Sequence, residues 1–347
     1  MLKDLLYTIL SCFYSFGVSM RHNLFDWGIL KVKSYYVPII CIGNVTVGGT
    51  GKTPMTEMIL SYMSKNYNVA VISRGYGRKT KGYIEVDESS HYRDVGDEPL
   101  QIKLKFPDTI VVVCEKRVDG IDQIIKKHPE VNLIIMDDGF QHRYVEPKIN
   151  VIMVDATRPP QDDYMLPLGS LRDNMESLHR AQYFIVTKCS ENMTPLDRRL
   201  MRKSLVTAPY QDIYFTRIES FKPTPVFSEA KNITLKHNDT VIAMAGIGNP
   251  NPFIGTLNMN YKVVDSLIYN DHHVYKIKDI KTINKLISQH PQAIIITTEK
   301  DAVKMLRSKK IPLEIREKLF YIPINISFID DSKIDFLKKL QEDVIKN

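Results

Sequence analysis

VPIICIGNVTVGGTGKTP, residues 37–54 of this 347-residue chain, is the strongest indication of its fold. An apolar run opens it, a glycine-rich loop ending in Gly51-Lys52-Thr53 follows, and a segment with helical character, MTEMILSYM, comes directly after. Strand, glycine loop and helix in this order are the context of a phosphate-binding P-loop. The sequence therefore predicts a site for a nucleoside triphosphate.

The residue types in this loop suit a triphosphate. Glycines let the backbone turn tightly, so that successive N–H groups face phosphate oxygens, and the following helix N-terminus adds partial positive charge. We expect Lys52 to reach the β- and γ-phosphates and the Thr53 hydroxyl to ligate Mg²⁺. In the strict G-x-x-x-x-G-K-T spacing, a glycine would stand at Thr46. The predicted nucleotide-binding residues are Gly48, Gly49, Thr50, Gly51, Lys52 and Thr53.

The composition is that of an ordinary folded protein large enough for two domains. Hydrophobic residues make up 44% and charged residues 25% of the chain, and the formal net charge is +7. This charge favours an anionic partner in general, such as a nucleotide, a phospholipid surface or a phosphorylated substrate. The four cysteines are scattered without a C-x-x-C pair, which argues against a zinc site or a disulfide framework and fits a reducing compartment.

Short apolar, β-rich runs alternate with helical segments through the first part of the chain. The expected strands lie at 39–42, 69–72, 109–113, 133–136, 150–154 and 183–186. Such alternation predicts an α/β fold with a P-loop NTPase-like, mostly parallel sheet and helices on both faces. Ligands on such sheets bind at the carboxyl ends of the strands, so the loops after these runs are the expected site.

The pattern loosens around residues 205–240, and strand-like runs resume at 241–245 and 293–297. We therefore expect three parts. They are an N-terminal helical segment over 1–35, a P-loop domain over 36–215 and a smaller C-terminal α/β domain over 216–347.

LIIMDDGFQH, residues 133–142, is the second strong signal. An apolar strand that ends in two carboxylates resembles a Walker B element, in which one aspartate holds Mg²⁺ opposite the P-loop threonine. The alternative is an acidic turn that binds nothing, which the neighbouring P-loop disfavours. The predicted metal ligands are Thr53, Asp137 and Asp138, and the choice between the two aspartates is left open. His142 fits either a substrate contact or an ordinary, partly buried histidine.

Two further loops carry cations. SRGYGRKTKGY, residues 73–83, suits phosphate or headgroup binding, although a solvated basic loop is the alternative. LPLGSLRD, residues 166–173, places Arg172 and Asp173 after another glycine turn, where they would clamp a phosphate or a sugar. The predicted substrate-binding residues are Arg74, Arg78, Gln141, His142 and Arg172.

Two other motifs have a structural interpretation as helix starts. In GDEP, residues 96–99, Asp97 and Glu98 are suited to the first turn of a helix. In TTEKDAVK, residues 297–304, Thr298 stands three residues before an aspartate, so helix capping is the default interpretation.

The N-terminus is apolar and amphipathic. No charged side chain occurs from Leu5 to Met20, and the apolar residues have helical spacing. The run is shorter than the ~20 residues of a membrane-spanning helix, and it lacks the cleavage site of a secretory signal. Two interpretations remain: a helix packed on the domain core, or a helix in a membrane interface with Trp27 at the boundary.

Taken together, the motifs resemble the tetraacyldisaccharide 4′-kinases, the lipid A 4′-kinase family of Gram-negative bacteria. The family's phosphate loop is similar to GN-x-T-x-GGTGKTP, which accounts for Thr46, whereas many relatives would have glutamate at Asp173. The motifs that carry the resemblance are GN-x-T-x-GGTGKTP (43–54), SRGYGR (73–78), GDEP (96–99), DDGFQH (137–142), LPLGSLRD (166–173), AGIGNP (245–250), DHH (271–273) and TTEKDAVK (297–304).

The resemblance implies transfer of the γ-phosphate of MgATP to the 4′-hydroxyl of a tetraacyldisaccharide 1-phosphate in lipid A biosynthesis. It implies that Asp97 and His272 cooperate to activate the acceptor hydroxyl. The developing charge on the phosphoryl group needs Lys52 as a third catalytic residue, and a base and a histidine from different domains require the C-terminal domain to close over the site. It also implies a peripheral or monotopic enzyme at the cytoplasmic face of the inner membrane. This favours the interfacial interpretation of the N-terminal helix. No protein partner is expected.

Other functions are compatible with a P-loop alone. One is an ATPase of the partitioning or metal-insertion type, although those with a deviant loop carry lysine where this chain has Val47. Another is a membrane-attached scaffold that binds ATP without transferring phosphate. Nucleic-acid binding is disfavoured because the basic residues form no long stripe and no recognised module.

Overall fold

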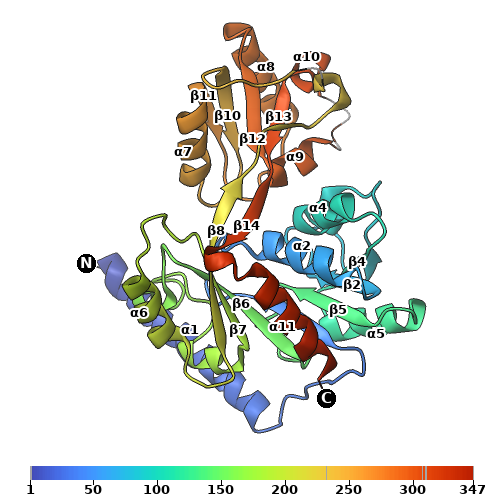
Figure 1. The fold of residues 1–347 in the computed structure, drawn as a ribbon, viewed down its shortest axis with the longest axis vertical. Coiled ribbons are helices and arrows are strands. Elements are labelled where there is room, and N and C mark those ends of the chain that lie inside the picture. The colour runs from blue at the N-terminus through green and yellow to red at the C-terminus, as the bar shows by residue number, and fades with distance from the viewer. Residues whose placement is uncertain (1, 232, 307, 309–310, 347) are drawn as a thin grey trace.

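The computed structural model describes residues 2–231, 233–306, 308 and 311–346. These residues form two α/β units, each built on its own sheet, that are joined by two strands (Figure 1). The first unit carries the P-loop and a nine-stranded sheet, and the second carries a five-stranded sheet.

The first sheet has the strand order β14-β8-β7-β6-β1-β5-β2-β4-β3. Neighbours from β8 to β4 are parallel, and the outermost strands β14 and β3 pair antiparallel. Each of the six expected strands is present within one residue of its expected ends, so the predicted α/β fold is confirmed. The strands are β1 (Ile39–Gly43), β2 (Val69–Ser73), β3 (Ile84–Glu85), β4 (Ile110–Val113), β5 (Leu133–Asp137), β6 (Ile149–Asp155), β7 (Tyr183–Thr187), β8 (Asp212–Ser220) and β14 (Ile324–Phe328).

Helices cover both faces of this sheet, which explains why its strands read as continuous apolar runs. Every residue of β1, β2, β5, β6 and β7 is buried. On one face Met55, Leu100 and Phe336 belong to the same core cluster, and on the other face Ile121 and Leu205 belong to a second cluster. The helices of the first face are α2 (Lys52–Met63), α4 (Asp97–Lys105) and α11 (Lys333–Ile345), and those of the second are α5 (Arg117–Lys127) and α6 (Pro195–Leu205).

The second unit repeats the same physical plan on a smaller scale. Its sheet has the order β11-β10-β12-β13-β9, and β9 is the antiparallel edge. Buried residues lie on both faces of the sheet in two further clusters. Its elements are β9 (Thr224–Pro225), β10 (Thr240–Ala245), α7 (Asn251–Asn260), β11 (Lys262–Ile268), α8 (Ile277–Gln289), β12 (Ile294–Thr298), α9 (Glu299–Leu306), α10 (Leu313–Arg316) and β13 (Leu319–Ile322).

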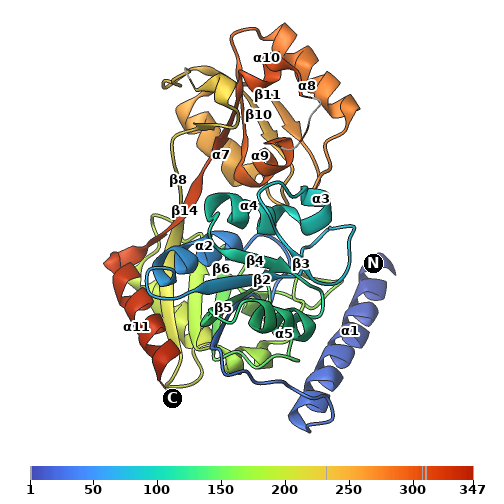
Figure 2. The same cartoon turned by 90° about the vertical axis from the view of Figure 1, so that its right-hand side faces the viewer.

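The chain leaves the first unit through β8 and returns to it through β14, and these two strands pair along the junction (Figures 1 and 2). The expected boundary between 215 and 216 falls inside β8. The expected C-terminal domain also included the last helix, but α11 packs on the first sheet. Its Phe336 ring lies 5.5 Å from that of Tyr183 and 5.1 Å from that of Tyr214. This helix returns because its apolar face completes the core of the first unit.

The N-terminal helix α1 (Leu2–Asp26) lies along one side of the first unit (Figure 2). It is held near its C-terminal end, where His22 Nε2 lies 2.6 Å from Asp173 Oδ1. Much of its apolar surface is uncovered, and the side chains of Phe13 and Phe16 are among the most exposed, with residue exposures of 71% and 69%. Within the described part of the chain, no helix combines the length and apolarity that crossing a bilayer requires.

Candidate active site

The loop between β1 and α2 has the geometry that its glycines predict. Gly48 and Gly51 have φ of +100° and +87°, a region where an L side chain would be strained. Asn44 donates to Thr50 Oγ1 at 2.9 Å, and Thr187 Oγ1 donates to the Thr50 carbonyl at 3.0 Å. The loop is therefore fixed from both sides, and α2 begins at its end. The first N–H groups of a helix have no carbonyl partner within the helix, so they are suited to bind phosphate.

Lys52 and Asp138 face each other across the mouth of this loop. Lys52 Nζ lies 3.6 Å from Asp138 Oδ1 and 3.3 Å from Asn44 Oδ1. Arg172 donates to both carboxylate oxygens of Asp138, one of them at 3.2 Å. Burial alone would raise the pKa of Asp138, but Lys52 and Arg172 together lower it below its usual range. Asp138 is therefore ionised at neutral pH.

Asp137 ends β5 and has a different environment, although it is the adjacent residue. Thr56 donates to its Oδ1 at 3.1 Å, while its buried Oδ2 has no hydrogen-bond partner among the described residues. Burial raises the pKa of Asp137 strongly, and the nearby carboxylates of Glu98 and Asp138 raise it further. A buried carboxylate oxygen without a donor is a suitable ligand for a divalent cation.

The donor set at this point fits Mg²⁺ rather than zinc. The oxygens come from Asp137, Asp138 and the Thr53 hydroxyl at the start of α2. Among the described residues, no three His, Cys, Asp or Glu side chains form a cluster able to hold a metal by themselves. Mg²⁺ in nucleotide enzymes normally takes one or two carboxylates and completes its shell with water and phosphate oxygens.

A second group of polar side chains brings the two units together. Asp97, the first residue of α4, is buried, and its Oδ2 lies 3.0 Å from Nδ1 of His272 in the loop after β11. The ring of Tyr76 lies 4.7 Å from the imidazole, and Lys300 Nζ lies 3.2 Å from Nε2. The sequence placed Asp97 and His272 together only through the family resemblance, and the structure brings them into contact.

Two lysines of α9 complete this group. Lys300 Nζ lies 3.2 Å from Glu98 Oε1, and Lys304 Nζ lies 3.6 Å from Asp97 Oδ2. Burial would raise the pKa of Asp97, but the hydrogen bond from His272 and the two lysine charges lower it to about 2. The sequence did not predict these lysines. The cap expected at Thr298 is present, since the side chains and backbone of Thr298 and Asp301 bond reciprocally. Two lysines one turn apart on a helix do not indicate, from sequence alone, that they contact the other unit.

Two of the predicted substrate-binding residues, Arg172 and Gln141, contact Asn44 at the start of the phosphate loop, and His142 lies beside the start of α5. Arg172 is bound to Asp138, and Gln141 donates to the Asn44 carbonyl at 2.9 Å. His142 Nε2 accepts the Arg117 backbone N–H at 3.3 Å. Burial and nearby arginines lower the pKa of His142 to about 4, so its ring is neutral at pH 7.

The two arginines of the basic loop have different surroundings. Arg74, directly after β2, is exposed. Arg78 is nearly covered, and its guanidinium donates to Glu115 and, at 2.8 Å, to the Gly82 carbonyl. Arg78 therefore stabilises its own loop. Asp173, expected to clamp a ligand, is likewise buried and holds α1 through His22.

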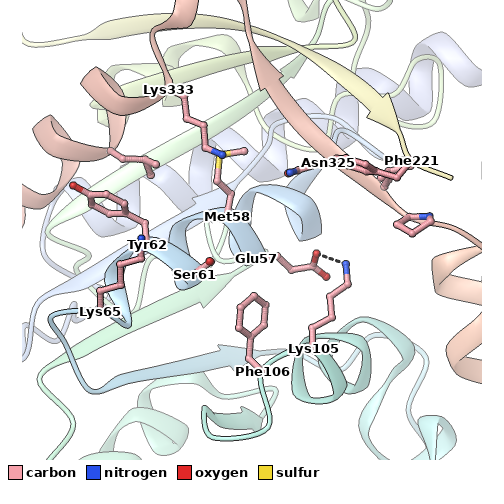
Figure 3. Close-up of a pocket in the computed structure, with 13 residues that line it drawn as sticks. Glu57, Met58, Ser61, Tyr62, Lys65, Lys105, Phe106, Phe221, Asn325 and Lys333 are labelled. Atoms are coloured by element: carbon pink, nitrogen blue, oxygen red, sulfur yellow. Dashed lines mark hydrogen bonds and ion pairs between the residues drawn. The ribbon is translucent and has the colours of Figure 1, made fainter. Parts of the chain in front are cut away.

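A separate groove of about 400 Å³ lies between α2, the end of α4, the junction strands and α11 (Figure 3). Lys105 and Glu57 form a 2.7 Å ion pair in it, and Lys105 also lies 2.6 Å from Glu299 of the second unit. None of the predicted site residues lines this groove.

Known proteins match this chain along almost its whole length. A sequence model of the family described as tetraacyldisaccharide-1-P 4′-kinase matches residues 3–342. The tetraacyldisaccharide 4′-kinase of Parabacteroides distasonis is 40% identical and covers 99% of this chain and 94% of that protein. The corresponding protein of Phocaeicola vulgatus is 38% identical and covers 97% and 94%.

A solved structure agrees with these sequence matches. The crystal structure of LpxK from Aquifex aeolicus in complex with ATP is similar with a TM-score of 0.74 and 25% identity, over 98% of this chain and 99% of that one. The chain therefore belongs to the tetraacyldisaccharide 4′-kinase family.

Proposed function

We propose that this protein transfers the γ-phosphate of MgATP to the 4′-hydroxyl of a tetraacyldisaccharide 1-phosphate. Membership of the family supports the reaction. The observation that carries the proposal is the contact between Asp97 of the P-loop unit and His272 of the second unit. A partitioning-type ATPase or a nucleotide-binding scaffold would have no need of such a base.

The phosphate loop would hold the triphosphate through the backbone N–H groups of 48–53 and through Lys52. Thr53 and one of Asp137 and Asp138 would hold Mg²⁺, with Asp137 Oδ2 as the oxygen that lacks a partner. When bound, the metal ion offsets negative charge on the phosphates during transfer. Arg172 keeps Asp138 ionised and fixes its orientation.

The acceptor hydroxyl has a high pKa and needs a base as it attacks. Its oxygen forms a bond to the γ-phosphorus, the bond from that phosphorus to the β–γ bridging oxygen breaks, and the hydroxyl proton passes to Asp97. His272 orients the carboxylate by holding its Oδ2. The cationic neighbours keep Asp97 ionised at any pH near neutrality, which makes it available as a proton acceptor.

The base and its histidine belong to different units, so the pair exists only while the units touch. Closure of the second unit over the phosphate loop would thus assemble the base and exclude water in one step. Exclusion of water matters because water would otherwise compete with the sugar for the phosphate.

The exposed face of α1 suits a membrane interface. Its uncovered apolar residues run along the helix, and an acyl chain anchored in a bilayer would lie beside them. The apolar residues of α1 that are exposed are Leu5, Leu6, Tyr7, Ile9, Leu10, Phe13, Tyr14, Phe16 and Met20. We place the enzyme at the cytoplasmic face of the inner membrane, where ATP is present.

Vesicle binding tests this placement. The double variant Phe13→Ser/Phe16→Ser should lose most of its co-sedimentation with anionic phospholipid vesicles. Met259→Ser, in the second unit, removes an equally exposed apolar side chain (79%) and should bind as the parent does. Equal binding of all three proteins would place the interface elsewhere.

Mass spectrometry tests the reaction. Purified protein is incubated with MgATP and a tetraacylated glucosamine disaccharide 1-phosphate, and we expect the lipid to gain one phosphate while ADP forms in equal amount. ADP formation that does not depend on the lipid would indicate an ATPase. ATP binding with an unmodified lipid would indicate a scaffold.

A further inference from the structure

Lys304 is a buried lysine whose side chain joins the two units. It lies on α9, and its side chain is 1% exposed, although lysine is rarely buried unless it is paired. Its Nζ lies 3.0 Å from Oδ1 of Asp301, one turn earlier on the same helix, and 3.6 Å from Oδ2 of Asp97 in the other unit.

We propose that Lys304 is a positioning residue that holds the carboxylate of Asp97 for phosphoryl transfer. The inference rests on the proposed function, because it assigns Lys304 a part in that reaction. Lys304 acts through Asp97 and does not itself meet the acceptor.

Asp301 alone does not account for the lysine. Asp301 Oδ2 already accepts the Gly246 backbone N–H at 2.8 Å and the Thr298 hydroxyl at 2.7 Å. Asp301 Oδ1 accepts from Lys304 itself at 3.0 Å, so this ion pair leaves only the second contact of the lysine to be explained. That second contact crosses the junction to Asp97 Oδ2, the oxygen that His272 and, at 4.0 Å, Lys300 also face.

This arrangement leaves the other oxygen of Asp97 for the acceptor. Oδ1 accepts one backbone N–H, from Glu98, at 3.0 Å. Because a carboxylate oxygen has two lone pairs, Oδ1 keeps one for a proton. Lys304 thus helps to hold the carboxylate by Oδ2 and leaves Oδ1 for the acceptor.

Lys304 differs from the other groups that face Asp97. His272 and Lys300 have side chains that are 24% and 18% exposed, so solvent partly screens them. Lys300 is also shared with Glu98 and Asp271. The Lys304 charge lies in the interior, where Coulomb interactions are screened least. It lowers the pKa of Asp97 together with His272 and Lys300, whose contributions are larger.

The other end of α4 supplies a matched control. Lys105 is the last residue of α4 and pairs with Glu299 at 2.6 Å and Glu57 at 2.7 Å. It therefore joins the same two helices, α4 and α9, without touching Asp97. Removal of Lys105 should weaken the junction but leave the base in place.

The test compares steady-state kinetics and melting temperature for the full-length parent, Lys304→Met, Lys304→Arg, Asp301→Asn/Lys304→Met and Lys105→Met. We expect Lys304→Met to lower kcat by roughly tenfold or more, with KM for ATP and lipid changed less than about threefold, since only the base is disturbed. Lys304→Arg should recover most of kcat. Lys105→Met should melt at a lower temperature yet keep kcat within about threefold of the parent.

The double variant separates positioning from charge balance. If Lys304 only neutralises Asp301, removing both charges should restore kcat, and the inference is overturned. If Lys304 positions Asp97, the double variant stays as impaired as Lys304→Met. If Lys304→Met fails to fold, the double variant still provides the test, because replacing Asp301 by asparagine avoids an unpaired buried charge at that position.

Parental kcat in Lys304→Met, or an equal loss in Lys105→Met, would likewise overturn the inference. A parent protein that leaves the lipid unmodified would instead overturn the proposed function. The two failures are therefore distinguishable.

Discussion

The nucleotide half and the base half of this site are built in different ways. The phosphate loop and the aspartate pair follow two adjacent strands of one sheet, where Ile42 of β1 lies beside Asp137 of β5. Asp97 and His272 are 175 residues apart in the chain and come from different units. One half is fixed by a single core, and the other depends on how two units meet.

In the proposed mechanism, this difference separates binding from catalysis. The nucleotide half should stay formed whether or not the second unit is in contact, because Asn44, Thr187 and Arg172 hold it from within the first unit. The base half needs α9 and the loop after β11. Substitutions in the first half should therefore alter nucleotide use, and those in the second should alter turnover alone.

The largest effect is expected from Asp97→Asn. It keeps the shape of the side chain but removes the proton acceptor, so kcat should fall by roughly 10²- to 10⁴-fold. ATP affinity, measured by calorimetry, should stay within about threefold of the parent because Asp97 lies outside the phosphate loop. His272→Gln should lower kcat as well, and the double variant should be little worse than the more damaging single change, because the two residues act as a unit. If the losses of kcat in the two single variants add in the double variant, Asp97 and His272 act independently and not as a unit.

Lys52→Met should also lower activity, but unlike Asp97→Asn it should weaken ATP binding as well. The ammonium group contacts Asp138 and Asn44 at the mouth of the loop and is placed to meet phosphate oxygens. Its removal should lower kcat/KM by roughly 10²- to 10³-fold and weaken ATP binding as well. Lys65→Met, beyond the end of α2 and exposed, is the control. Unchanged ATP affinity in Lys52→Met would remove the contrast between the two halves.

The same contrast explains what the sequence could predict. The loop 43–54 and the pair Asp137–Asp138 are contiguous motifs at strand ends, so spacing and residue type suffice to identify them. The strands of the first sheet are equally easy to identify from the sequence, because burial on both faces makes them continuous apolar runs.

Contacts between segments that are distant in the chain produce no recognisable motif in the sequence. Lys304 reads as part of a helix with an ordinary cap, and only the fold brings it to Asp97. Arg78 and Asp173 have the residue types of ligand contacts, but the structure pairs them with Glu115 and His22. α11 carries an amphipathic pattern that fits either core, so its return to the first unit depended on topology.

A smaller effect should distinguish the two arginines of the basic loop. Arg74 is exposed, and its charge acts on His142. Arg74→Met should raise KM for the lipid by roughly tenfold, as loss of a charged hydrogen bond would. Arg78→Met should leave KM unchanged and lower the free energy of unfolding by about 1–3 kcal/mol, since Glu115 loses its partner. Kinetics and thermal melts of both variants test the assignment. If Arg78→Met raised KM for the lipid and Arg74→Met did not, Arg78 and not Arg74 would be assigned to the substrate site.

The smallest effect concerns Asp137 and appears in stability. Burial raises its pKa in the folded protein above the ordinary value of 3.8, so the folded state holds this proton more tightly than the unfolded state. The associated stability is complete below pH 3.8 and is lost as pH rises through the folded pKa. In metal-free protein, Asp137→Asn should therefore be more stable than the parent at pH 8, by about 1 kcal/mol or more, because one pKa unit corresponds to about 1.4 kcal/mol.

The advantage of Asp137→Asn should shrink toward pH 4.5, where the parent carboxyl becomes neutral as well. Thermal melts with a chelator at both pH values measure this. Adding MgATP should reverse the order at pH 8, since the parent gains a ligand through an oxygen that now lacks a partner and the amide is a poorer one. An equal difference at both pH values would mean that the substitution acts through packing. Ionised Asp137 would then not destabilise the metal-free fold, so a bound cation would relieve no such destabilisation. Only the phosphate loop would then be arranged in advance to bind MgATP.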